Sequence, residues 1–394
     1  MAINSKAGYQ RLIAASTLCL GASVCAPVFA QDILHDWDLS SEVTLRGGFE
    51  NVNGENSHFV IAAPQFSLQR QNDDLSISLS GNAELDQVGG DQFSARSLGT
   101  QATVGLRLNQ HAAAELGISY GITQPRSSDP DLPTDVKVAG HEQQFGLVAQ
   151  YSHQFSKTAM QLRGSVGRSQ TANSLLNDNS YQSNADQNAW TYGIGGRISR
   201  ELTPTIQAFV DAQLSRSRFD ATSTTLGASR NSWTYEAEIG AEVSFDQRLQ
   251  GTASLGYLRQ SFDDTSLDAL QTFTYGANLD WQTSDTSQVV LAVDTNISPS
   301  PSSGEAMRIV DTGRLTFNQQ INSSLQGSVF GELQREHYQT STDEIKTTRA
   351  GLGLQYQANK QLSAFANYSF SLREAPTDVR RTHLIEAGLR FNRQ

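Results

Sequence analysis

The sequence has few cysteines, a shortage of cations and no long apolar segment beyond its N-terminus. Only two of its 394 residues are cysteine, Cys19 and Cys25. Residues 31–394 therefore offer no disulfide, thiolate metal ligand or cysteine nucleophile. With 29 Lys and Arg against 40 Asp and Glu, the net charge of -11 disfavours nucleic acid as a partner. A hydrophobic fraction of 38% argues against a bundle of membrane-spanning helices.

The first thirty residues have the pattern of a secretory signal peptide. Lys6 and Arg11 precede an apolar run from Leu12 to Ala26, and Val28-Phe29-Ala30 places small residues where a signal peptidase reads them. We expect cleavage after this segment, so that residues 31–394 form the exported protein.

From Leu39 onward, apolar and polar residues alternate with a period of two over stretches of about 12 to 15 residues. Between Trp233 and Phe245, for example, the odd positions are apolar and most even positions are Thr, Glu or Ser. Such alternation indicates strands with one apolar and one polar face. Ordinary strands average about 5 to 6 residues, whereas a tilted strand needs about 9 to 11 to cross a bilayer. The length therefore favours a membrane barrel over a soluble sandwich.

These stretches predict an all-β protein, a transmembrane antiparallel up-and-down β-barrel of about 18 strands. The predicted strands cover residues 39–50, 58–70, 74–85, 95–108, 112–123, 141–154, 158–169, 187–199, 205–219, 231–245, 249–261, 270–281, 287–297, 306–317, 323–336, 345–357, 361–373 and 380–392. Their connections alternate between short turns, expected on the periplasmic side, and longer extracellular loops. The longer loops cover 51–57, 86–94, 124–140, 170–186, 220–230, 262–269, 298–305, 337–343 and 374–379. The expected location is the bacterial outer membrane.

Aromatic residues on the apolar face concentrate at the strand ends, which predicts two girdles around a lipid-facing aliphatic belt. Those expected near the long loops are Phe49, Tyr120, Phe145, Trp190, Trp233, Tyr257, Phe273 and Phe370. Those expected near the short turns are Phe66, Phe155, Phe245, Trp281, Phe317, Tyr356 and Phe391.

The long loops are strongly acidic, with sixteen Asp and Glu against Arg126, Lys137 and Arg230. Outer-membrane lipid is an expected partner, and these loops are expected either to hold divalent cations that bridge to lipopolysaccharide or simply to stay solvated. Partners in polysaccharide export, including periplasmic proteins, are a further expectation, whereas the oligomeric state is left open.

The polar face is expected to line a water-filled channel, because a barrel of this size is roughly 35 Å across and side chains cannot fill it. The candidate lining residues are Arg46, Arg107, Asp211, Glu236, Glu238, Glu242, Asp294, Arg308, Arg314, Glu332 and Arg349, together with Phe209, Phe330 and Phe365. One folded-in loop, 124–140 or 170–186, is expected to narrow the pore.

Two features of this polar face have two interpretations each. The inward Phe209, Phe330 and Phe365 either form a track for sugar rings or pack against long neighbouring side chains. The carboxylates of Glu236, Glu238 and Glu242 either select ions or join an Arg–Glu ladder.

One strand breaks the alternation, because its parity places Asp311 on the lipid face. A carboxylate there is costly. We therefore predict a β-bulge near Thr312–Gly313 that returns Asp311 to the lumen.

The sequence offers no pattern of an enzyme. Its seven histidines are dispersed without metal-ligand spacing, and no nucleophile elbow or Ser/His/Asp grouping is present. We expect no catalytic residues, no metal and no cofactor.

The second half resembles the β-barrel porin type-two family of outer-membrane proteins. The resemblance rests on Gly256-Tyr257-Leu258-Arg259-Gln260-Ser261-Phe262, Tyr275-Gly276-Ala277-Asn278-Leu279-Asp280-Trp281, Gly351-Leu352-Gly353-Leu354-Gln355-Tyr356, residues 359–369 and Gly388-Leu389-Arg390-Phe391. It implies an outer-membrane barrel, and members of this family are often associated with exopolysaccharide production and export. Unlike many barrels, the chain does not end on an aromatic residue, because Asn392-Arg393-Gln394 follows Phe391.

Three functions fit these observations. The leading expectation is a porin-like conduit for exported exopolysaccharide or oligosaccharide, favoured by the inward phenylalanines and the family resemblance. The alternatives are a passive, weakly cation-selective diffusion porin for small solutes and a non-conducting structural or adhesive barrel.

Overall fold

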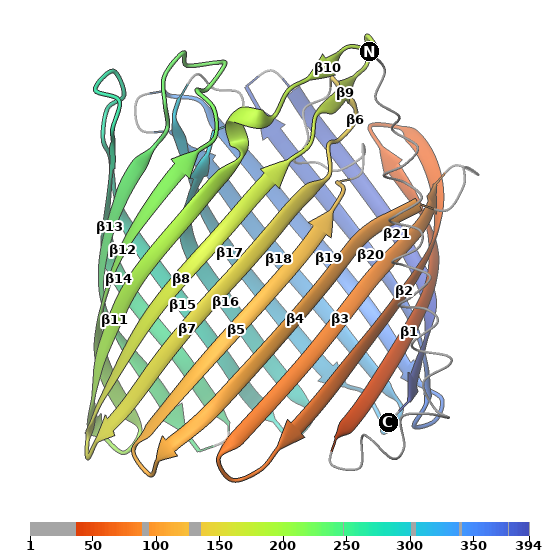
Figure 1. Ribbon diagram of the computed structural model, residues 1–394. Coiled ribbons are helices and arrows are strands. Elements are labelled where there is room, and N and C mark those ends of the chain that lie inside the picture. The colour runs from red at the N-terminus through yellow and green to blue at the C-terminus, as the bar shows by residue number, and fades with distance from the viewer. Residues whose placement is uncertain are drawn as a thin grey trace.

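The computed structural model describes residues 37–88, 94–125, 135–246, 248–300, 305–338, 341–376 and 378–393. An 18-stranded antiparallel sheet closes on itself, since β1 pairs with both β2 and β21 (Figure 1). Its strands are β1 (Asp38–Val52), β2 (Glu55–Gln71), β3 (Leu75–Val88), β4 (Ser94–Asn109), β5 (Ala112–Thr123), β7 (Glu142–Phe155), β8 (Thr158–Thr171), β11 (Ala189–Thr203), β12 (Ile206–Phe219), β13 (Ser232–Phe245), β14 (Leu249–Phe262), β15 (Leu270–Ser284), β16 (Ser287–Pro299), β17 (Met307–Gln320), β18 (Leu325–His337), β19 (Glu344–Gln357), β20 (Leu362–Ala375) and β21 (Asp378–Arg393).

The predicted barrel is confirmed, because each of the eighteen predicted stretches coincides with one barrel strand. Each strand pairs with its sequence neighbours in the barrel, as up-and-down topology requires, and β1–β21 pairing closes the ring. The predicted signal peptide lies outside the described residues.

Three of the turns at the short-connection end are built on asparagine side chains. The Oδ1 atom of Asn72 accepts hydrogen bonds from the backbone N–H groups of Asp74 and Leu75 at 3.2 and 2.7 Å. Asn322, between β17 and β18, and Asn359, between β19 and β20, make the same pair of bonds. Side-chain oxygens thus supply acceptors that a tight turn otherwise lacks, which explains why these connections stay short.

Two of the predicted long loops are wrong. At 51–57, β1 runs to Val52 and β2 starts at Glu55, which leaves a turn of two residues, and at 374–379 the pairing of β20 with β21 extends to Ala375 and Asp378. Asn53 and Gly54 both have positive φ, 51° and 96°, which suits a tight hairpin whose twist matches the flanking strands. The Asn–Gly pair carried this signal in the sequence.

The two faces of the sheet follow the predicted parity. Of the predicted girdle residues, those with large exposed outer surfaces include Phe49, Tyr120, Trp190, Trp233, Tyr257 and Phe273 toward the long loops and Phe155, Phe245, Trp281, Phe317, Tyr356 and Phe391 toward the short turns. Exposed Ile194, Ile239 and Leu255 lie between the two rows. This exposed belt is apolar because its solvent is lipid.

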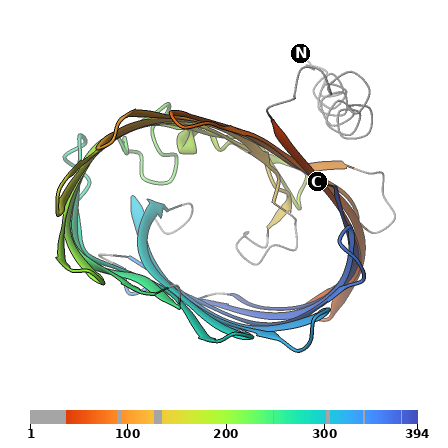
Figure 2. The ribbon, with the colours of Figure 1, turned by 90° about the horizontal axis from the view of Figure 1, so that it is seen from below.

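The end of the β16–β17 hairpin leaves the barrel wall. Pairing between β15 and β16 stops at Gly276 and Asp294, whereas β16 and β17 remain paired as far as Pro299 and Met307. Seen from below, this blue-green hairpin end lies inside the ring formed by the other strands (Figure 2).

Apolar packing holds the hairpin end inside. Met307 and Ile309, on the parity of the outward Leu315, form a buried cluster with Leu270, whose parity is inward. The outer face of the hairpin end therefore covers the inner face of β14 and β15. Burial of about 25 cal/mol per Å² of apolar surface favours this arrangement over an exposed hairpin.

The predicted bulge at Thr312–Gly313 is wrong, because the β16–β17 register is unbroken from Ser287 to Pro299. Asp311 therefore stays on the outward parity. It accepts a hydrogen bond from Thr295 Oγ1 at 2.9 Å, and His337 Nδ1 lies 3.5 Å from its other oxygen. Neighbouring polar side chains thus satisfy the carboxylate at the level where the hairpin has left β15, so no change of register is needed.

Two of the long loops are joined to each other. The short strands β6 (Val136–Val138), β9 (Ser174–Leu176) and β10 (Tyr181–Gln182) form a three-stranded sheet at the long-loop end (Figure 1). A 3-10 helix, η1 (Ala185–Gln187), follows. Among the described residues, no helix is long and apolar enough to cross a membrane.

Gly48 tests the closure of the barrel, because it lies where β1 meets β21. A Cβ atom at Gly48 would lie 2.2 Å from the backbone oxygen of Ile385 and 2.8 Å from Cζ of Phe59. We expect Gly48→Ala to destabilise the folded barrel by roughly 1–3 kcal/mol. At the adjacent Gly47 the nearest atom would be 3.4 Å away, so Gly47→Ala serves as the control. The stability of both variants is measured by urea titration, with the folded fraction read from the heat-modifiable mobility on gels. Equal stability of the two variants would contradict the close approach.

Candidate channel lining

The strand registers place all fourteen candidate lining residues on the face opposite to the aromatic girdles. Directly paired residues in antiparallel strands share a face. Arg197, Asp211 and Glu238 are paired across β11, β12 and β13, and Arg314, Glu332 and Arg349 across β17, β18 and β19. Most of these side chains gather in three clusters, whereas Arg107 and Asp294 lie apart from them.

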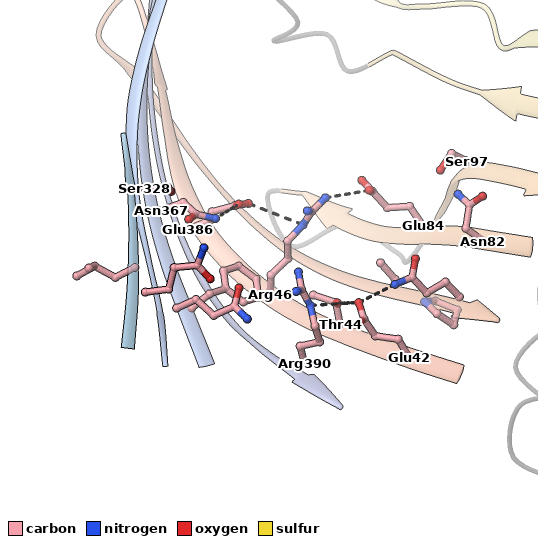
Figure 3. Close-up of a pocket in the computed structure, with 18 of the residues that line it drawn as sticks. Glu42, Thr44, Arg46, Asn82, Glu84, Ser97, Ser328, Asn367, Glu386 and Arg390 are labelled. Carbon is pink, nitrogen blue, oxygen red and sulfur yellow. Dashed lines mark hydrogen bonds and ion pairs between the residues drawn. The ribbon is translucent and has the colours of Figure 1, made fainter. Parts of the chain in front are cut away.

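The first cluster surrounds Arg46 in a cavity of about 480 Å³ on the inner wall (Figure 3). The Arg46 guanidinium contacts Glu84 at 2.9 Å and Glu386 at 3.8 Å. Arg390 contacts Glu42 at 3.1 Å, and Gln65 donates to the same carboxylate at 2.7 Å. The wall here is a lattice of paired charges and amides.

The second cluster is centred on Asp211, which is 7% exposed. Arg163 approaches its two oxygens at 2.7 and 2.9 Å, and Arg197 lies 2.9 Å from one of them. Arg197 also contacts Glu242 at 2.9 Å. Two arginines thus offset two carboxylates, so Glu242 belongs to an Arg–Glu ladder rather than to a free acidic row.

The third cluster is centred on Glu332. Arg349 contacts it at 2.5 Å and Arg314 at 3.3 Å. Further toward the long loops, Arg308 contacts the buried Glu336 at 2.5 Å. Charge-assisted bonds of this kind fix the long side chains against the wall.

The inward phenylalanines lie flat on the wall, each against a glycine of the next strand. A Cβ at Gly240 would lie 2.3 Å from the Phe209 ring, and one at Gly351 would lie 2.4 Å from that of Phe330. A Cβ at Gly388 would likewise meet Phe365 at 2.7 Å.

Arginine side chains cover these rings on the lumenal side. Arg197, Arg314 and Arg390 lie 4.0, 4.4 and 5.9 Å from the ring centroids of Phe209, Phe330 and Phe365 respectively. Phe209 is only 3% exposed. The structure therefore favours packing against neighbouring side chains over a track for sugar rings.

Several lumenal carboxylates have no basic partner. Within the described residues, no Lys or Arg lies within ion-pair distance of Glu236, Glu238 or Asp294. Asn296 donates to Asp294 at 2.5 Å, but an amide does not neutralise the charge. Among the arginines of the candidate lining, Arg107 has no carboxylate partner within the described residues. The lining therefore keeps an excess of negative charge.

A buried arginine holds the mouth of the barrel together. Arg230, in the loop after β12, is 2% exposed and donates to the backbone oxygens of Asp186 at 2.6 Å and Ser300 at 3.2 Å. Its guanidinium also lies 4.9 Å from the ring of Phe219. Burial lowers the pKa of Arg230, with Asp186 opposing the change. Because Ser300 directly follows β16, this contact ties the inward hairpin to two loops across the mouth.

Sequence reasoning missed the contacts of Arg230 and did not foresee the inward β16–β17 hairpin end, whereas its expectation of a folded-in loop stays a prediction. Loops 124–140 and 170–186 pair with each other through β6 and β9, and the described part of the hairpin end, residues 298–300 and 305–309, lies inside the barrel. Arg230 had a weak signal as one of three cations in acidic loops, but its partners are distant in the sequence. Within the described residues, no group of three His, Asp or Glu side chains could hold a metal ion.

Comparison with known proteins decides the family. Residues 38–392 match the family model described as putative beta-barrel porin 2. The chain belongs to this family. The match spans the whole barrel, and no curated protein sequence is detectably similar to the chain.

Solved outer-membrane proteins share the fold of this porin. OpdO of Pseudomonas aeruginosa is 12% identical, with a TM-score of 0.51 and coverage of 91% of this chain and 98% of that one. OccK2 (OpdF) of Pseudomonas aeruginosa, solved with glucuronate, gives the same values. The porin covers 64% of the FrpB iron transporter of Neisseria meningitidis, at 12% identity and a TM-score of 0.47. The porin is thus a β-barrel channel protein of the bacterial outer membrane.

A substitution of Arg230 tests directly whether its contacts hold the hairpin end inside the barrel. We expect Arg230→Ala to release the hairpin end, because the backbone oxygens of Asp186 and Ser300 lose their shared donor. Single-channel conductance in planar bilayers should rise, with more frequent switching between levels. Arg248→Ala, which removes an exposed arginine from a short turn, is the control and should leave conductance unchanged. Identical traces for both variants would show that the hairpin does not restrict the pore.

Proposed function

We propose that this porin is a passive diffusion channel for small polar solutes, with a preference for cations over anions. The observation that carries the proposal is the excess of lumenal carboxylates that lack basic partners, Glu236, Glu238 and Asp294 above all. Fixed negative charge along a water-filled path raises the local concentration of cations and repels anions. The family and the structural neighbours are channels and transporters, and we infer no catalytic activity.

Hollows on the lumenal wall support a path for hydrated solutes. Besides the cavity beside Arg46, a second cavity of about 690 Å³ lies toward the short turns and is lined by Gln207, Glu242, Asn278 and Asp280. Such polar groups replace lost water contacts for a passing solute and bind it only weakly, as fast diffusion requires.

A conduit for exopolysaccharide or oligosaccharide is the second candidate. The inward phenylalanines no longer support it, but the cavity beside Arg46 brings Gln65, Asn82, Asn367 and Gln355 together around paired charges. Amides and charged groups of this kind hydrogen-bond sugar hydroxyls. Loss of secreted polysaccharide on deletion of the gene, with normal uptake of small solutes, would favour this candidate over the first.

The charge preference is measured by the reversal potential across a planar bilayer in a KCl gradient. We expect the reversal potential to have the sign that indicates cation selectivity. It should be smaller in the double variant Glu236→Gln/Glu238→Gln, because two lumenal charges are removed. Glu344→Gln is the control, since Glu344 shares the outward face with Arg335. Anion selectivity, or an unchanged potential in the double variant, would refute the proposal. A membrane with inserted protein and no current steps would favour the non-conducting alternative.

A further inference from the structure

The outward surface at the long-loop end of β8, β11, β12, β13 and β14 carries a row of arginines beside the aromatic girdle. The four side chains are Arg168, Arg216, Arg218 and Arg259, here called the outer arginine rim. The registers pair Arg168 and Arg218 with Trp190, Arg216 with Trp233, and Arg259 with Tyr235. Each therefore faces the same way as a lipid-facing aromatic residue.

Two of these arginines are held in place by the same arrangement. Arg168 lies over the Trp190 ring at 5.4 Å and donates to Asp220 at 2.8 Å. Arg216 lies over the Trp233 ring at 5.2 Å and donates to Asp263 at 2.7 Å. The arginine in each pair lowers the pKa of its aspartate, so both pairs stay ionised at neutral pH. Loop aspartates thus fix two guanidinium groups upright against indole rings.

The other two arginines are left open to a ligand. Arg218 and Arg259 are exposed, and no carboxylate within the described residues lies at ion-pair distance from either, although the charge of Arg218 adds to that of Arg216 in lowering the pKa of Asp263. The outward positions of β8 and β11–β15 hold no Asp or Glu. Below the rim these positions are apolar, with exposed Ile194, Val210 and Ile239. The surface therefore passes from aliphatic, through aromatic, to cationic.

We propose that the outer arginine rim binds the phosphate groups of lipopolysaccharide in the outer leaflet. Trp and Tyr girdles lie at the membrane interface, and long arginine side chains extend their charge from that level toward the head groups. A guanidinium group matches the geometry of a phosphate and can bind it through two parallel hydrogen bonds. The lipid-facing aromatic surface beneath the rim points to a phosphate carried by a lipid rather than to a free anion.

Two aspartates of the long loops form ion pairs with the outer arginine rim. Asp220 and Asp263 belong to the acidic long loops, yet each is engaged with an arginine of the wall. These two carboxylates orient cations and are not available to bridge a divalent ion to the lipid. Direct contact with phosphate is therefore the mode that this part of the surface supports.

Binding of purified lipopolysaccharide to the full-length protein in detergent, followed by native mass spectrometry, tests the proposal. We expect Arg218→Gln/Arg259→Gln to weaken binding roughly thirtyfold, since each cation near an anionic surface contributes a factor of about five. The matched control is Arg70→Gln/Arg200→Gln, which removes two outward arginines at the short-turn end. Heat-modifiable gel mobility checks that both double variants fold.

Three results would overturn the proposal. Equal binding by the two double variants would show that the rim is not the site. Binding that is abolished by EDTA and indifferent to the rim variant would assign the lipid to divalent ions on the acidic loops. Complete competition by millimolar inorganic phosphate would identify a general anion site rather than a lipid site. Channel conductance is a separate measurement, so failure of the lipid-binding proposal does not refute the proposed channel function.

Discussion

The structure depends on one constraint, the need to satisfy every backbone hydrogen bond of a sheet surrounded by lipid. A strand edge in hydrocarbon has no water to replace a missing partner. Pairing of β1 with β21 meets this need by closing the ring, and the tight approach at Gly48 shows how closely the two strands are joined. A long interruption, between β15 and β16, lies at the long-loop end, where the hairpin end finds new contacts inside the barrel.

Closure also determines the chemistry of each face. Because neighbouring side chains alternate between lipid and lumen, β13 presents Tyr235 and Ile239 outward and Glu236 and Glu238 inward. Glycines on one strand make room for inward phenylalanines on the next, and arginines cover those rings while binding nearby carboxylates. The wall is thus packed and charged at once, so that most lumenal charge is compensated and a small acidic excess remains.

Sequence patterns predicted what depends on local order and missed what depends on distant contacts. Period-two alternation located all eighteen strands, and the parity of residues such as Glu332 and Phe330 gave their face. The inward turn of the β16–β17 hairpin could not be foreseen, since Met307 meets Leu270 and Arg230 meets Ser300 only in the folded barrel. The bulge predicted to turn Asp311 inward was wrong for the same reason, because its partners Thr295 and His337 lie on other strands.

The alternation of lipid and water along each strand is the central claim, and cysteine scanning of β13 tests it most directly. With Cys19 and Cys25 replaced by serine, single cysteines at residues 236–243 in the reconstituted protein are exposed to a water-soluble maleimide. The account predicts labelling at Glu236, Glu238 and Glu242 and protection at Ala237, Ile239 and Ala241. Uniform labelling along the strand, or labelling of the odd positions alone, would contradict it.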